Sequence, residues 1–209
     1  MKRVFSLLLL LLPVAVMAQT LHFPYNPSLS PNGETIYFSY DGDIFNVPSK
    51  GGLAMRLVSL GGTESNPKVS PCGKYIAFAS DIQGNNDVYI VPVAGGDVKR
   101  LTWHEGNDVP SGWSKDSKYV YFETDRANGK TTYKVSVDGA TPVRLLDGYF
   151  NTIVNVAENP VTGEFYFNES NESRSFPTRK HYVGDHNPNV KSWNPANGEY
   201  RELTSYEGK

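Results

Sequence analysis

Hydrophobic and polar residues alternate with a period of two along short runs of this chain. The segment KYIAFAS, residues 74–80, is one such run, and shorter runs occupy residues 68–70, 88–93 and 98–102. Because successive side chains of an extended backbone point to opposite faces, this spacing predicts β-strands and excludes helices for these segments. We expect no helix in the chain after residue 18.

The same pattern recurs about every forty residues. The stretch NPKVSPCGKYIAFASDIQGNNDVYIVPVAGGDVKRLT, which begins at Asn66, has counterparts that begin at Asn26 and Asp108. Matching positions are occupied by Ser30, Ser70 and Ser114, by Phe38, Phe78 and Phe122, by Gly51, Gly95 and Gly139, and by the pairs Arg56-Leu57, Arg100-Leu101 and Arg144-Leu145. A divergent fourth copy covers 158–170 and 189–204, with an insertion between its parts. Self-similarity at such a period is typical of repeat architectures.

Four antiparallel strands per copy, at a period in the low forties, predict an all-β fold made of β-propeller blades. We expect four blades, at approximately 21–62, 63–106, 107–150 and 151–204. Residues 205–209 align with the segment that links the second copy to the third. They are expected to begin a further blade, so the chain is interpreted as part of an incomplete six- or seven-bladed propeller rather than a closed four-bladed ring.

The first eighteen residues have the composition of a secretory signal peptide. Lys2 and Arg3 precede an apolar run at 5–12, and small residues lead to a cleavage site between Ala18 and Gln19. The apolar run is too short to span a bilayer, and no later segment approaches the roughly 20 apolar residues that a span needs. We expect a protein exported to the periplasm or secreted, without a membrane span.

Composition and charge exclude several classes of function. Without Lys2 and Arg3 the chain has 18 basic and 22 acidic side chains, and the basic residues are scattered. A nucleic-acid-binding protein would need a basic stripe, so no nucleic-acid partner is expected. The single cysteine, Cys72, cannot form an internal disulfide, and packing must stabilise the fold.

Cys72 lies in a repeated hairpin turn, which argues against a chemical role. The four copies read SPNG, SPCG, SKDS and NPVTG at this place. Proline suits the first central position of a turn, a polar residue the next, and glycine the left-handed position after it. The residues assigned to these structural turns are Pro31, Asn32, Gly33, Pro71, Cys72, Gly73 and Asp116.

No catalytic residue, metal site or cofactor is predicted. The chain has no G-x-S-x-G pentapeptide, and the repeated serines suit turn entries. His181, Asp185 and His186 have a composition that could hold zinc, but not the spacing of a zinc site. The loop DIQGNND at 81–87 lacks the ligand pattern of a calcium loop, and the NES sequences at 168 and 171 would matter only in a eukaryotic secretory route.

The motif N-P-x-x-S-P-x-G-x-x-I-A-F-x-S-D, followed by D-[VI]-Y, G-G and R-L-T, resembles the TolB-type propeller repeat over 26–146 and, more loosely, over 158–204. Such blades occur in TolB, in tricorn-type serine peptidases and in relatives of prolyl oligopeptidase. The repeat starts directly after the signal, without room for the α/β domain that precedes the propeller of TolB. The phrases GDIFNVPSKGG and GNNDVYIVPVAGG look like the opening blades of tricorn-type peptidases.

This resemblance implies a non-catalytic propeller segment from the N-terminal region of a tricorn-like serine peptidase, where the propeller filters or channels peptides toward a distant protease core. The alternative is a TolB-like periplasmic scaffold unrelated to proteolysis. A peptide or protein partner is expected in either case. Trp113 is expected to fill the gap between two blades. The candidate binding residues are Trp103, His104, Arg179, Lys180, His181 and Tyr182.

Overall fold

The computed structural model describes residues 23–127, 129–146, 152–169 and 189–205. These residues form sixteen strands in four antiparallel sheets of four strands each, and they include no helix. The prediction of an all-β fold built from four-stranded blades is confirmed. The signal sequence and residues 206–209 lie outside the described residues.

Each sheet is a meander whose strands follow chain order. Blade 1 contains β1 (Tyr25–Leu29), β2 (Thr35–Tyr40), β3 (Asp43–Pro48) and β4 (Met55–Val58). Blade 2 contains β5 (Glu64–Val69), β6 (Tyr75–Ser80), β7 (Asp87–Pro92) and β8 (Lys99–Arg100). Blade 3 contains β9 (Asp108–Trp113), β10 (Tyr119–Ala127), β11 (Gly129–Ser136) and β12 (Val143–Arg144). Blade 4 contains β13 (Val154–Glu158), β14 (Phe165–Asn168), β15 (Val190–Asn194) and β16 (Glu199–Glu202).

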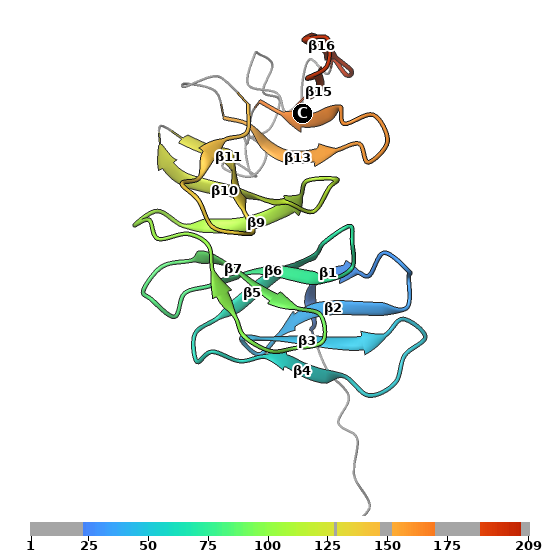
Figure 1. The fold of residues 1–209 in the computed structure, drawn as a ribbon, viewed down its shortest axis with the longest axis vertical. Helices are drawn as coiled ribbons and strands as arrows, with labels where there is room; N and C mark the ends of the chain where they lie inside the picture. The colour runs from blue at the N-terminus through green and yellow to red at the C-terminus, as the bar shows by residue number, and fades with distance from the viewer. Residues whose placement is uncertain (1–22, 128, 147–151, 170–188, 206–209) are drawn as a thin grey trace, which may run out of the picture.

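The blades stack in chain order, with blade 1 at one end of the molecule and blade 4 at the other (Figure 1). Apolar side chains fill the spaces between neighbouring blades. One cluster between blades 1 and 2 contains Ile44, Phe78 and Tyr89, and one between blades 2 and 3 contains Leu101 and Phe122. Burial of such side chains away from water is the main force that holds successive blades together.

The first strand of blade 2 begins four residues earlier than the sequence pattern indicates. Asn66 lies within it in the left-handed conformation, with φ 53°, and the pairing with β6 shifts between Ser65 and Lys68. An asparagine tolerates this conformation, which forms a β-bulge. Asn66 and Pro67 therefore lie inside the strand, at this bulge.

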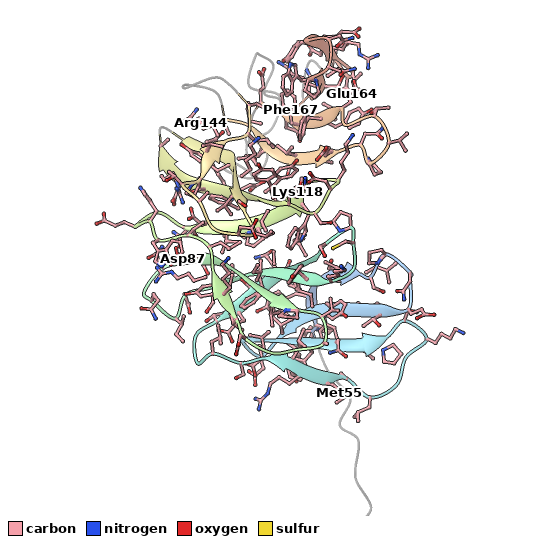
Figure 2. All side chains as sticks on the ribbon, in the orientation of Figure 1. Met55, Asp87, Lys118, Arg144, Glu164 and Phe167 are labelled. Atoms are coloured by element: carbon pink, nitrogen blue, oxygen red, sulfur yellow. The ribbon has the colours of Figure 1, made fainter. Side chains whose placement is uncertain are left out.

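The strand order gives the stack two faces with different connections. The hairpins between first and second strands and between third and fourth strands lie on one face, the turn face. The connections between second and third strands and the linkers between blades lie on the other, the linker face. In Figure 2, Asp87 and Arg144 mark the linker side of the molecule, and Lys118 and Glu164 mark the turn side.

Two of the linkers are fixed by a glycine and an aspartate. A Cβ atom added at Gly62 would lie 2.8 Å from Asp81 Oδ1, and one added at Gly106 would lie 2.8 Å from Asp125 Oδ1. Asp81 accepts a hydrogen bond of 2.6 Å from the N–H of Thr63, and Asp125 one of 2.8 Å from that of Asn107. Only glycine fits this close approach, so each linker is held against the blade that follows it.

Candidate functional site

Trp103 and His104 lie on the linker face, in the linker between blades 2 and 3. The Trp103 side chain is 65% exposed. His104 Nδ1 accepts a hydrogen bond of 2.9 Å from the N–H of Gly106, which orients the imidazole within the linker. Asn85, in the connection between β6 and β7, donates to the carbonyl oxygens of His104 and Gly106 at 2.8 and 3.0 Å. Neighbouring connections therefore hold these two candidate residues in place.

Arg100 supports Trp103 from within the blade. Its guanidinium carbon lies 5.7 Å from the centroid of the Trp103 ring, a cation–π contact. The same guanidinium donates to Asp87 Oδ2 at 2.5 Å and to the carbonyl oxygen of Thr102 at 2.8 Å. Asp87 is fully buried and also accepts from the Thr102 hydroxyl at 3.1 Å. The exposed indole thus contacts a partly buried arginine that is paired with a fully buried acid.

A second acid and arginine lie beside this linker. Asp108, the first residue of β9, is fully buried and forms an ion pair with Arg126 of β10. Burial raises the pKa of Asp108 above its ordinary value, although the neighbouring threonine hydroxyls and the Arg126 guanidinium counteract part of this effect. The linker carrying Trp103 therefore lies beside two buried aspartates, each paired with a partly buried arginine.

These supporting residues were not identified as part of a site from the sequence. The Arg-Leu pairs of the repeat were recognised, but not their partners. The signal that could have found them is the recurrence of Asp43 and Asp87, each thirteen residues before the repeated arginine. In the structure both aspartates form ion pairs with those arginines, Arg56 and Arg100.

The candidate residues Arg179, Lys180, His181 and Tyr182 lie outside the described residues, as do His186 and Asp185. The connection that contains them begins and ends on the linker face. Its two ends meet where Asn168 donates a hydrogen bond of 2.9 Å to the carbonyl oxygen of Asn189.

The predicted turn residues lie on the turn face, away from Trp103. Gly33 and Gly73 have left-handed φ angles of 74° and 69° and donate backbone hydrogen bonds to Ser30 and Ser70 at 2.9 and 2.8 Å. Pro31, Asn32, Pro71 and Asp116 occupy the matching tips. In blade 3 the left-handed residue is Ser117, with φ 59°.

Cys72 is exposed at the tip of the blade 2 turn. Its backbone N–H donates a hydrogen bond of 3.0 Å to the Ser117 hydroxyl of the neighbouring blade. Burial raises the pKa of the thiol, but hydrogen bonds from Ser70 and Ser117 and the nearby Lys74 outweigh it, and the net pKa is lowered. Among the residues that the structure describes, no histidine or carboxylate forms a hydrogen bond with the Cys72 thiol that would make a catalytic pair.

Trp113 fills the space between blades 2 and 3. Its side chain is 7% exposed and packs in the cluster that contains Leu101 and Phe122. The indole N–H donates a hydrogen bond of 2.7 Å to the carbonyl oxygen of Lys68 in blade 2. Trp113 therefore belongs to the packing of the blades, whereas Trp103 belongs to the surface.

Within the described part of the chain, no group of three or more histidine, cysteine and acidic side chains could hold a metal ion. No helix in that part is long and apolar enough to cross a membrane.

Several solved structures are similar to this chain. The tricorn protease matches 88% of the chain with a TM-score of 0.69 at 20% identity, and TolB from Acinetobacter baumannii matches 87% with a TM-score of 0.62 at 20% identity. A puromycin-hydrolyzing peptidase from Mycobacterium tuberculosis matches 88% with a TM-score of 0.64 at 17% identity. The chain spans only 18%, 43% and 30% of these three proteins, respectively. At such identities the similarity establishes the fold alone.

No curated protein matches the sequence. The family model of the tricorn protease N-terminal beta propeller domain matches residues 23–209. This match covers nearly all of the chain that follows the predicted signal. The chain therefore belongs to the family of the tricorn protease N-terminal β-propeller domain.

Proposed function

We propose that this chain is an exported, non-catalytic propeller segment that binds peptide or protein segments on its linker face, as the N-terminal part of a tricorn-like serine peptidase. The observation that carries this proposal is the fixed, exposed indole of Trp103, which contacts Arg100 of the Arg100–Asp87 ion pair. Rigid aromatic side chains held at a surface are typical of residues that contribute most to binding. The signal-like residues 1–18 support export.

Substrate access is the form of binding that suits a peptidase. A peptide bound on the linker face would be selected or guided before it reaches a catalytic domain, and the propeller would supply no catalytic group. We expect the chain by itself to leave peptides intact, and Cys72 to be dispensable.

The experiment is a titration of the full chain with unstructured peptides of ten residues and varied sequence, followed by NMR. Trp103→Ala should weaken binding at least about tenfold, because exposed aromatic anchors commonly contribute more than 1 kcal/mol. The matched control is Tyr119→Ala on the turn face, which also removes an exposed ring in a cation–π contact and should leave binding unchanged. Equal binding by both variants and the wild type would reject the linker face as the site.

The alternative is a periplasmic scaffold that binds folded protein partners and belongs to no peptidase. The similarity of the blades to TolB favours it. The intact mass of the natural product and the sequence of its gene distinguish the peptidase proposal from the scaffold alternative. Further blades followed by a PDZ-like and a protease region support the peptidase. A natural protein without a protease region, which binds folded partners but not peptides, supports the scaffold.

A further inference from the structure

The second and third strands of blades 1–3 carry facing aromatic side chains at matching positions, and in blades 2 and 3 these rings pack toward the preceding blade. The pairs are Phe38–Phe45, Phe78–Tyr89 and Phe122–Tyr133, with ring centroids 6.0, 5.7 and 6.0 Å apart. In blade 4, Phe167 of β14 stands directly opposite Lys191 of β15. The fourth blade therefore lacks one ring of a pair that the other three blades share.

Lys191 does not replace that ring. Its ammonium group forms an ion pair with Glu169 and lies 5.6 Å from the centroid of the Tyr200 ring. Tyr200, on β16, contacts Phe167 with ring centroids 6.2 Å apart. The lysine thus interacts with residues of its own blade.

A pocket of about 220 Å³ occupies this place between blades 3 and 4. Its lining residues are Leu145, Leu146, Ile153, Phe167, Glu169, Trp193 and Tyr200. We call it the aromatic pocket. Figure 2 shows Phe167 at the boundary between the two blades. Leu146 leads into a linker, and Glu169 into the connection after β14, so the pocket is on the linker face together with Trp103.

The lining indicates the kind of group that fits. Three rings and three aliphatic side chains provide an apolar wall, and Trp193 is held rigid by stacking on Phe165 with centroids 5.8 Å apart. Pockets for drug-sized ligands usually measure about 300–1,000 Å³, so this smaller one suits a single side chain.

We propose that the aromatic pocket binds an aromatic side chain of a peptide, which takes the place of the ring that blades 1–3 supply themselves. This inference rests on the proposed binding of peptides to the linker face, and it specifies the residue that such a peptide must carry. Phenylalanine satisfies the site best, because its ring needs no hydrogen-bond partner among the aliphatic side chains.

The test compares two capped pentapeptides, Gly-Gly-Phe-Gly-Gly and Gly-Gly-Ala-Gly-Gly, titrated against the full chain and followed by NMR. The phenylalanine peptide should bind at least about tenfold more tightly, as expected for the burial of one ring. Lys191→Tyr gives blade 4 the ring found at positions 89 and 133, and should abolish the preference. If Lys191→Tyr does not fold, Leu146→Phe replaces it in the test. This substitution narrows the pocket from the side of blade 3 and should also abolish the preference.

The matched control is Lys118→Tyr, the same substitution at an exposed lysine of the turn face, and it should keep the preference. If both peptides bind equally to the wild type and Trp103→Ala weakens both, the pocket inference is overturned while the proposed function stands. If neither pentapeptide binds, and the ten-residue peptides do not bind either, the pocket inference and the proposed function are both overturned. A preference that emerges only after Tyr149→Ala and Phe150→Ala would mean that the chain's own segment fills the pocket, which also overturns the inference.

Discussion

The interface between blades 2 and 3 differs from the interface between blades 3 and 4 in what fills it. The first is mainly an apolar cluster that includes Leu101, Trp113 and Phe122, all buried, and the Trp113 indole donates a hydrogen bond to the carbonyl oxygen of Lys68. The second combines apolar residues with hydrogen bonds to carboxylates: Tyr121 donates to Glu158 at 2.6 Å, and the N–H of Asn155 donates to Glu123 at 3.0 Å. It also contains the aromatic pocket.

Blades 2 and 4 nevertheless share a hydrogen bond that ties the third strand to the residue following the fourth strand. The Thr102 hydroxyl accepts a hydrogen bond of 2.9 Å from the N–H of Val88, and the Thr204 hydroxyl accepts one of 2.9 Å from that of Val190. Backbone hydrogen bonding and turn geometry therefore define a blade, while the side chains between blades can change in polarity and completeness. This difference gives blade 4 an apolar pocket, whereas the lining of the pocket of about 260 Å³ between blades 2 and 3 includes the charged residues Asp97, Lys99 and Asp138.

Truncation of the buried phenylalanines should test the comparison most strongly. Phe122→Ala removes a fully buried ring and should lower the free energy of unfolding by about 3–5 kcal/mol, through lost burial and an empty cavity. Phe167→Ala removes the matching ring beside an existing pocket, and should cost clearly less. Urea denaturation measures both. Equal losses would mean that the two interfaces are equally well packed.

Replacement of the repeated arginine should lower the free energy of unfolding more in blade 2 than in blade 1. Arg100→Met leaves the fully buried carboxylate of Asp87 without its ion pair, and should cost about 3 kcal/mol. Arg56→Met breaks the corresponding pair with Asp43, but the Arg56 side chain is 60% exposed, and the cost should stay below about 1 kcal/mol. A similar loss in both variants, measured by denaturation, would contradict the contrast in burial.

The pH dependence should distinguish the buried acid Asp108 from the turn acid Asp116. Burial raises the pKa of Asp108, whereas the hydrogen bond from Ser114 is the main cause of the lowered pKa of Asp116. Above its unfolded pKa, Asp116 stabilises the fold, and this contribution is lost as pH falls through its lower folded pKa. The contribution of Asp108 to the free energy of unfolding changes with pH in the opposite direction, because the folded state holds the Asp108 proton more tightly. This contribution falls as pH rises from about 4.

Carboxyl NMR titration of the two residues gives the order of their pKa values directly. Asp108→Asn should remove only the loss of stability that accompanies the rise of pH from about 4, and should leave the trend caused by Asp116. If Asp116 takes up its proton at a higher pH than Asp108, the assignment of the two environments is wrong.

The smallest effect is expected at Cys72. Cys72→Asn restores the residue found in the same turn of blade 1 and should change the free energy of unfolding by no more than about 0.5 kcal/mol. In the native protein, iodoacetamide should alkylate the exposed thiol with a pH midpoint below that of an ordinary cysteine, because its pKa is lowered. A thiol that reacts only after unfolding would contradict its exposed position.

The sequence was sufficient to predict the blades because strand alternation and turn residues recur at matching positions. It also distinguished Trp113, beside the repeated Ser114, from Trp103 in a linker. These features depend on local backbone preferences and on the two-residue period of a strand, which can be read without knowledge of neighbouring blades.

The aromatic pocket could not be predicted because it depends on strand register. Trp113 and Glu158 hold matching positions, since they pair with the first core residues of β10 and β14, Val120 and Phe165. Trp113 follows Leu101 by twelve residues, but Glu158 follows Leu145 by thirteen. A shift of one residue exchanges the faces of a strand, so the side chains facing blade 3 become clear only from the pairing itself.

The linker glycines have a consequence for how such a protein can grow. Gly62 and Asp81 hold the entry to blade 2, and Gly106 and Asp125 hold the entry to blade 3, so each pair joins two successive repeat units. A gene duplication that copies residues 63–106 copies the aspartate of one such contact and the glycine of the next. New blades can therefore be added one at a time, without compensating changes elsewhere in the chain, and each is then free to diverge as blade 4 has.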